Sequence, residues 1–182
     1  MSFKLLLATL PALAFAACTG PAVNTNGLDL IKSFESFQAN VYDDGYGNPT
    51  IGYGHLCSDS TCSEVTFSKP LTEDTASQLL AKDLVTYQNG VTNALATAVT
   101  LNDNQYAALV SWTFNVGVGN MQSSSLVSRM NAGENVETVA SEELPKWNKA
   151  NGAVVAGLTR RRADEVKLFE EASQTKALPV GC

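Results

Sequence analysis

Histidine is nearly absent from this chain, and basic residues are scarce. The 182 residues contain one histidine, at position 55, so a metal site built from several histidines is excluded. There are 12 Lys and Arg against 18 Asp and Glu. The net charge of −6 disfavours a sequence-independent nucleic-acid binder, which needs a basic surplus. Hydrophobic residues make up 45% of the chain, which excludes intrinsic disorder.

The chain also lacks an apolar run long enough to cross a bilayer at its N-terminus. The run after Lys4 spans only positions 5–18. With the small alanines near its end, residues 1–16 predict a secretory signal peptide, and the mature chain would cover residues 17–182. We therefore expect a secreted, extracellular protein without a membrane span. The alternative is a bacterial lipoprotein signal, in which Cys18 would carry the lipid.

Cysteine is limited to positions 18, 57, 62 and 182, which are too scattered for a zinc finger. Secretion would expose these thiols to an oxidising compartment, so an even number predicts two disulfides. A Cys57–Cys62 bridge would close a short polar loop. A Cys18–Cys182 bridge would join the ends of the mature chain, because chain ends often lie close together in compact domains.

The sequence pattern predicts an α+β fold in a single domain of two lobes. The first lobe, about residues 17–70, contains a helix at 27–39, short strands with tight turns at 41–54, and a cysteine loop at 55–70. The second lobe, about residues 71–182, is mainly helical. It opens with a long helix that Thr72 caps and Gly90 ends, and further helices follow at 102–116, 123–132, 135–144 and about 159–173, the last two started by Asn135 and Thr159.

Three polar residues in the first lobe suit hydrolytic chemistry. Glu35 lies among apolar residues of the first predicted helix, where a carboxyl keeps its proton more readily, as a general acid must. Asp43 and Asp44 open the glycine-rich turn, and Thr50 follows it. Each residue alone has an ordinary explanation, as an exposed Glu, turn aspartates and a strand threonine. Together they place an acid beside a carboxylate and a hydroxyl that could activate water.

The spacing of these residues resembles a known catalytic pattern. Glu35, eight residues, Asp44, five residues and Thr50 resemble the catalytic triad of phage-type lysozymes, glycoside hydrolase family 24. Three segments resemble family segments in the same order, namely TIGYGHL at 50–56, AALVSWTFNVG at 107–117 and GLTRRR at 157–162. The resemblance covers about residues 27–172. With the signal peptide and the Cys57/Cys62 pair, it is greatest to the secreted fungal members.

The resemblance implies a lysozyme-like fold with a cleft between the lobes and a muramidase activity. Such an enzyme hydrolyses the β-1,4 bond between N-acetylmuramic acid and N-acetylglucosamine in peptidoglycan. Glu35 would donate the proton, and Asp44 and Thr50 would hold the attacking water, with inversion at the anomeric carbon. Asp43 is the alternative to Asp44 as the carboxylate that holds the water, because only the spacing in the family pattern favours Asp44. No metal or organic cofactor is implied, and we expect a monomer.

Further residues are candidates for the cleft. Tyr46 and Asn115 would contact sugar, although turn tyrosines and helix asparagines are more often structural. Arg161 would reach Glu35 by its position in the family pattern. We expect Trp112 and Trp147 in the core rather than as sugar platforms.

An ion pair is predicted between His55 and Asp83. Asp83 falls in an apolar stripe of the long helix, where an unpaired charge is costly. The resemblance places it near the hairpin histidine, and the pair should raise the pKa of His55 and lower the pKa of Asp83. Alternatively, Asp83 turns to solvent or meets an arginine.

Two other classes of function compete with the muramidase hypothesis. One is a hydrolase of a chitin-type N-acetylglucosamine polymer, and the other is a non-catalytic wall-binding protein. The complete Glu–Asp–Thr set argues against a non-catalytic protein, and against a lytic transglycosylase, which needs no water-activating Asp. Because both the chain and the bacterial wall are anionic, we expect activity to be greatest on the acid side of neutrality.

Overall fold

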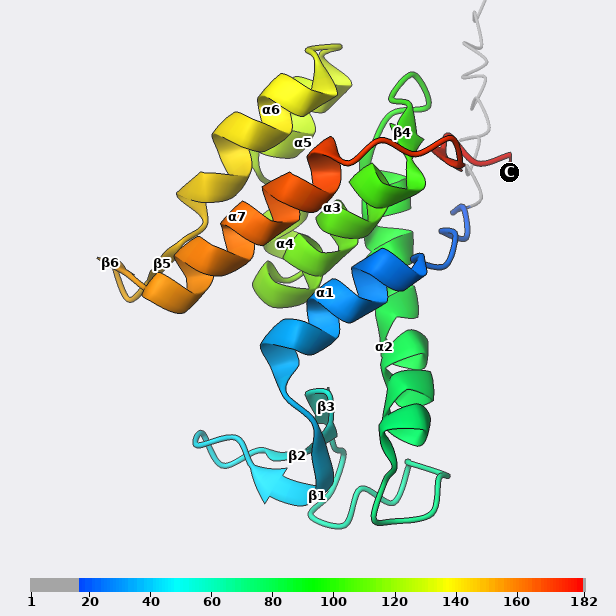
Figure 1. Ribbon diagram of the computed structural model, residues 1–182, viewed down its shortest axis with the longest axis vertical. Coiled ribbons are helices and arrows are strands. Elements are labelled where there is room, and N and C mark those ends of the chain that lie inside the picture. Colours follow the sequence, from blue (N-terminus) through cyan, green and yellow to red (C-terminus); the bar gives the residue numbers. More distant parts are fainter. Residues whose placement is uncertain (1–16, 182) are drawn as a thin grey trace, which may run out of the picture.

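The computed structural model describes residues 17–181. The predicted signal peptide at 1–16 and Cys182 lie outside the described residues. Figure 1 shows a bundle of helices above a small sheet, with α2 running along both. The helices are α1 Thr25–Glu35, α2 Glu73–Ala94, α3 Asp103–Val116, α4 Val118–Gln122, α5 Ser125–Asn131, α6 Val136–Glu143 and α7 Ala156–Glu170, with a 3-10 turn at Leu144–Lys146.

The strands form three small antiparallel sheets. They are β1 Gln38–Asp43, β2 Pro49–Gly52, β3 His55–Leu56, β4 Leu101–Asn102, β5 Lys149–Ala150, β6 Ala153–Val154 and β7 Lys176–Leu178. The largest sheet has the order β1-β2-β3, and the other two pair β4 with β7 and β5 with β6. The strands predicted at 41–54 thus belong to β1 and β2, which form a hairpin.

The first helix differs from its prediction at both ends. It begins at Thr25, where the Asn24 side chain accepts a hydrogen bond from the Gly27 N–H at 3.0 Å, and it ends at Glu35 rather than at residue 39. Ser36 has a φ of +54°, and β1 begins two residues later. The backbone leaves the helix at Ser36, and Phe37 then packs its ring on Tyr53, with centroids 5.7 Å apart. Glu35 is therefore the last residue of α1.

The long helix begins as predicted but does not end at Gly90. Thr72 caps α2 in a reciprocal capping box with Thr75. The helix continues through Gly90 to Ala94. A Cβ at Gly90 would lie 3.0 Å from both γ-methyl groups of Val118, so the glycine allows α4 to pack close to α2. Its role is close packing and not helix termination.

The later helices follow the sequence pattern with two differences. The caps at Asn102 and Asn135 start α3 and α6, and the Asn135 cap was predicted. The short α4 was not predicted as a separate helix. The last helix begins at Ala156 instead of Thr159, so the three arginines at 160–162 lie in its second turn and not at its N-terminus.

The core lies mainly among α2, α3 and α7. Trp112 on α3 is fully buried and packs edge-to-face on Trp147, with ring centroids 5.4 Å apart, as expected for core residues. The first helix packs on α3 and α7, whereas β2 packs on α2. The helical part of the fold thus includes α1, which the predicted lobe boundary assigns to the small lobe. Within residues 17–181, no helix has both the length and the apolar character to span a membrane.

Candidate active site

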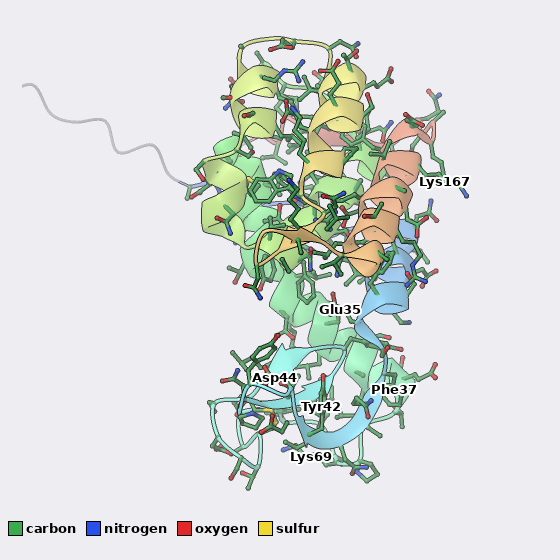
Figure 2. The ribbon with its side chains drawn as sticks, turned by 90° about the vertical axis from the view of Figure 1, so that its left-hand side faces the viewer. Glu35, Phe37, Tyr42, Asp44, Lys69 and Lys167 are labelled. Carbon is green, nitrogen blue, oxygen red and sulfur yellow. A yellow bond between two sulfur atoms is a disulfide. The ribbon has the colours of Figure 1, made fainter. Side chains whose placement is uncertain are left out.

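Glu35 lies where the helical part of the molecule meets the small sheet. Figure 2 shows its side chain at the end of α1, above the hairpin that carries Tyr42 and Asp44. Its Oε1 accepts a hydrogen bond from Nη1 of Arg161 at 2.6 Å. The Arg161 side chain is 5% exposed and the Glu35 side chain 22%. The carboxyl is thus fixed on one side by a buried cation and open on the other.

A buried network holds Arg161 in place. Glu165 on the same helix has no exposed side-chain surface, and its Oε1 accepts from Arg161 Nε at 3.3 Å and from the Ser111 hydroxyl at 2.8 Å. The other carboxylate oxygen of Glu165 pairs with Arg162 Nε at 2.7 Å. Arg161 also donates to the Ser111 carbonyl at 3.3 Å. The Arg161 guanidinium that contacts Glu35 is therefore held in place by its hydrogen bonds to Glu165 and Ser111.

Asp43 and Asp44 stabilise the turn between β1 and β2. The four successive backbone N–H groups of residues 45–48 donate to these two carboxylates at 2.7–3.1 Å, alternately to one and the other. The Asn48 side chain adds a bond to Asp44 at 2.9 Å and is the main cause that lowers the pKa of Asp44. Asp44 is thus kept ionised, which suits a group that accepts a hydrogen bond from water.

Thr50 and Tyr42 face each other across the β1–β2 pair. Thr50 is buried, and its hydroxyl donates to the Asn48 carbonyl at 3.2 Å. Burial raises the pKa of Tyr42, and the charges of Glu35 and Asp44 raise it further. The Tyr42 phenol therefore lies within electrostatic reach of both carboxylates. Sequence reasoning missed Tyr42.

A cavity of about 550 Å³ opens beside Glu35, a size typical of small-ligand sites. Its lining comes from α1, β3, α2 and α3 and consists of Glu35, Gly54, His55, Leu56, Lys82, Asp83, Thr86, Tyr87, Phe114 and Asn115. Gly54 was not predicted as a site residue. It has a φ of +84°, and a Cβ there would lie 3.5 Å from Glu35 Oε2, so its backbone lies against the carboxyl.

The predicted sugar contacts occupy different places. Asn115 lines the cavity, whereas Tyr46 is 90% exposed at the tip of the β1–β2 turn and is not among the lining residues. The ring of Tyr87 packs edge-to-face on Phe114, with centroids 5.0 Å apart. This aromatic pair was missed, although Tyr87 lies one helical turn after Asp83 and Phe114 precedes Asn115.

Comparison with known proteins agrees with this geometry. A family model described as phage lysozyme matches residues 32–165, which include Glu35, Asp44, Thr50 and Arg161. The chain belongs to the phage lysozyme family. The endolysin of Bacillus phage PZA is 40% identical over 149 residues, which cover 81% of this chain and 54% of the endolysin. The endolysin of Salmonella phage P22 is 32% identical over 145 residues, which cover 78% and 94%. The chain thus spans about half the length of the Bacillus phage endolysins that it matches.

Solved structures share the lysozyme fold. The muramidase domain of SpmX from Asticaccaulis excentricus superposes with a TM-score of 0.70 at 34% identity, covering 82% of this chain and 98% of that domain. A mutant of P22 lysozyme superposes with a TM-score of 0.71 at 28% identity, covering 83% and 99%. The predicted α+β lysozyme-like architecture is confirmed.

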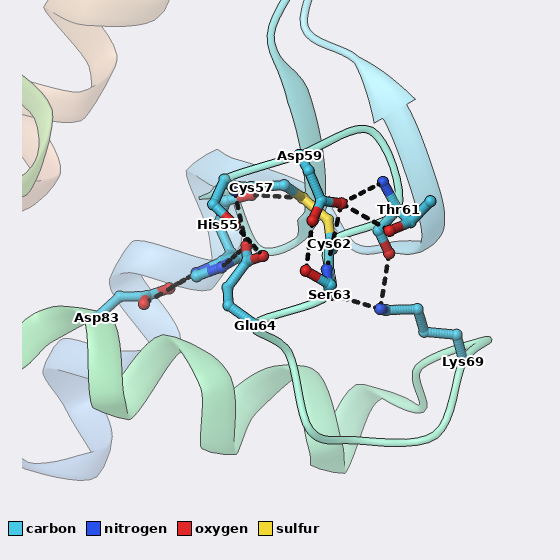
Figure 3. Close-up of polar contacts among 10 residues, drawn as sticks. His55, Cys57, Asp59, Thr61, Cys62, Ser63, Glu64, Lys69 and Asp83 are labelled. Carbon is cyan, nitrogen blue, oxygen red and sulfur yellow. Dashed lines mark hydrogen bonds and ion pairs between the residues drawn. A yellow bond between two sulfur atoms is a disulfide. The ribbon is translucent and has the colours of Figure 1, made fainter.

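His55 lies between two carboxylates at the edge of the cavity (Figure 3). Its Nδ1 is 3.0 Å from both oxygens of Asp83, and its Nε2 is 3.1 Å from Glu64 Oε1. The expected pKa of Asp83 was wrong in direction, because burial raises it more than His55 lowers it. With both ring nitrogens engaged, His55 connects the loop after β3 to α2.

The loop after β3 is closed by the Cys57–Cys62 disulfide, as predicted (Figure 3). Glu64 accepts from the Ser58 hydroxyl, which is the main cause that lowers its pKa to about 2. Cys57, Cys62 and Glu64 form the one grouping of potential metal ligands among the described residues. Since both sulfurs are in the disulfide, this group of residues can offer a metal ion only the Glu64 carboxylate. The second predicted bridge, Cys18–Cys182, includes a residue outside the described range.

Proposed function

We propose that this chain is a muramidase that hydrolyses the β-1,4 bonds between N-acetylmuramic acid and N-acetylglucosamine in peptidoglycan. The observation that carries the proposal is the Glu35 carboxyl, which is held by the buried Arg161 at 2.6 Å and opens on a 550 Å³ cavity. The family membership and the similarity to endolysins and to a muramidase domain support it. Glu35 is the general acid that protonates the leaving oxygen.

Asp44 and Thr50 hold the attacking water in this proposal. Asp44 offers an ionised carboxylate fixed by three hydrogen bonds, and Thr50 offers a hydroxyl on the neighbouring strand. A water between acid and base needs carboxyls about 6.5–9.5 Å apart, and it attacks from the face opposite the leaving group. The reaction then inverts the anomeric carbon.

The matched pair Asp43→Asn and Asp44→Asn tests these roles. Both aspartates accept two backbone hydrogen bonds in the same turn, and Asp44 accepts a third from the Asn48 side chain, so the melting temperatures of the two variants are compared alongside their activities. We expect Asp44→Asn to lose most wall-clearing activity and Asp43→Asn to retain it. Equal losses would assign both residues to turn structure alone.

The activity itself is tested by the clearing of bacterial walls, measured beside colloidal chitin. Glu35→Gln should abolish clearing while the protein remains folded. NMR of the first product from a defined oligomer reports the anomer, and a retained configuration would overturn the water-holding role of Asp44. Faster hydrolysis of chitin than of walls would replace the muramidase proposal with a chitin-type hydrolase.

We also propose that the protein is secreted, is monomeric and resembles the secreted fungal members of the family. The signal-like residues 1–16 and the disulfide between Cys57 and Cys62 support secretion, because disulfides persist in oxidising compartments. N-terminal sequencing of the exported protein should read from Ala17. A product that stays inside the cell would contradict this proposal.

A further inference from the structure

Lys82 is the one lysine or arginine among the residues that line the cavity beside Glu35. The two acidic lining residues already have partners, since Glu35 pairs with Arg161 at 2.6 Å and Asp83 contacts the His55 ring at 3.0 Å. Lys82 is exposed, and within residues 17–181 no ion pair engages its ammonium. Its charge acts through space on the neighbouring Asp83, whose pKa it lowers against the effect of burial, but the ammonium has no carboxylate in direct contact among the described residues.

An aromatic ring fixes the position of this charge. The ammonium nitrogen of Lys82 lies 4.5 Å from the centroid of the Phe67 ring, within the range of a cation–π contact. Phe67 is partly buried against the core, so the ring is anchored. A lysine that is held in place loses less side-chain freedom when it binds an anion than a lysine that moves freely in solvent. Thr86, one helical turn further along α2, lines the same cavity and lies on the same helix face.

We propose that Lys82 recognises a carboxylate of the peptide stem that the peptidoglycan glycan carries, and so favours this substrate over neutral chitin. The proposal rests on the muramidase function proposed above. The whole chain has a net charge of −6, so its overall field repels an anionic wall. A single fixed cation at the cleft supplies a local attraction that works against this repulsion and is absent for an uncharged polymer.

The experiment compares two forms of one soluble glycan fragment. One form bears peptide stems with free carboxylates, and in the other the same carboxylates are converted to amides. Neither form contains wall phosphates, so any charge effect belongs to the carboxylates. Lys82→Gln is compared with the wild type, with Lys82→Arg and with Lys32→Gln. Lys32 is a matched control, because its ammonium lies 5.2 Å from the Tyr53 ring but it does not line the cavity.

We expect Lys82→Gln to raise KM for the carboxylate form about two- to five-fold, the effect of losing one exposed charge pair, with kcat nearly unchanged. KM for the amidated form should not change, and added salt should shrink the difference. Lys82→Arg should restore the wild-type KM, and Lys32→Gln should behave as wild type.

The proposed role of Lys82 would be overturned by an equal effect of Lys82→Gln on both forms, by no effect on either form, or by the same effect from Lys32→Gln. Failure of the wild type to hydrolyse either form is a different result, because it contradicts the muramidase function itself. Melting temperatures of all variants establish that each comparison is made between folded proteins.

Discussion

Replacing Glu165 with Gln should destabilise the fold and loosen the active site together. The Glu165 side chain is fully buried between Arg161 and Arg162, whose side chains are 5% and 1% exposed. Burial raises the pKa of Glu165, and the two guanidinium groups oppose that effect. Gln keeps the size of the side chain and a bond to Ser111 but removes the negative charge. Arg162 then loses its carboxylate partner, and Arg161 keeps Glu35 alone.

The expected cost follows from this burial. Removing one partner of a buried ion pair costs about 3–5 kcal/mol, because the remaining charge is left without compensation. The amide can still accept one hydrogen bond, so we expect the lower end, about 3 kcal/mol. For a chain of this length that corresponds to a melting temperature lower by roughly 6–12 °C. Arg161 also loses one anchor, so wall-clearing activity should fall even at temperatures where the variant is folded.

Urea unfolding and thermal melting measure the loss, and Glu134→Gln provides a matched control. Glu134 pairs with Arg129 at 2.7 Å, but its side chain is 45% exposed, so its loss should change stability far less. Similar losses in the two variants would refute the reasoning that burial of the network decides its importance. Unchanged activity of folded Glu165→Gln would show that Arg161 does not depend on Glu165 for its position.

Four further results are expected. Replacing both Cys57 and Cys62 with Ala should cost about 2 kcal/mol in chemical unfolding, the loop-entropy value for so short a loop. His55→Asn and Asp83→Asn should be non-additive, because the side chains are in contact. Burial raises the pKa of Asp83, so the wild type should lose this group's contribution to stability as pH rises above about 3.9, and Asp83→Asn should lack that loss. Tyr46→Ala should leave the melting temperature unchanged, since the ring is 90% exposed, and raise KM for walls.

The hairpin turn could be predicted closely because its information is local. The glycine-rich residues between Asp44 and Thr50 predict the turn, whereas the strand register, in which Tyr42 faces Thr50, was not predicted. Helix caps such as Thr72 and Asn135 are local as well. These features need only the residues beside them, so the sequence pattern was sufficient.

Features that depend on distant neighbours were not predictable in the same way. The turn after α1 brings the ring of Phe37 against Tyr53, which lies beyond the hairpin turn in the sequence. Gly90 lies inside α2, where a Cβ would come within 3.0 Å of Val118 in α4. The direction of the Asp83 pKa depends on how deeply the fold buries the carboxyl. Each depends on a contact or a burial that exists only once the chain has folded.

The arginines at 160–162 show how a helix boundary changes the environment that a side chain is expected to have. At a helix N-terminus three cations would oppose the macrodipole and would belong on a solvated surface. In the second turn of α7 each of the three arginines has a different contact. Arg160 lies over the Phe34 ring at 5.2 Å, Arg162 pairs with Glu165, and Arg161 reaches Glu35. Glu35 ends α1, where the unsatisfied carbonyls already carry partial negative charge, so an unpaired carboxylate there would be unfavourable. Arg161 offsets both charges from a neighbouring helix, so the position of the acid at the end of α1 depends on α7.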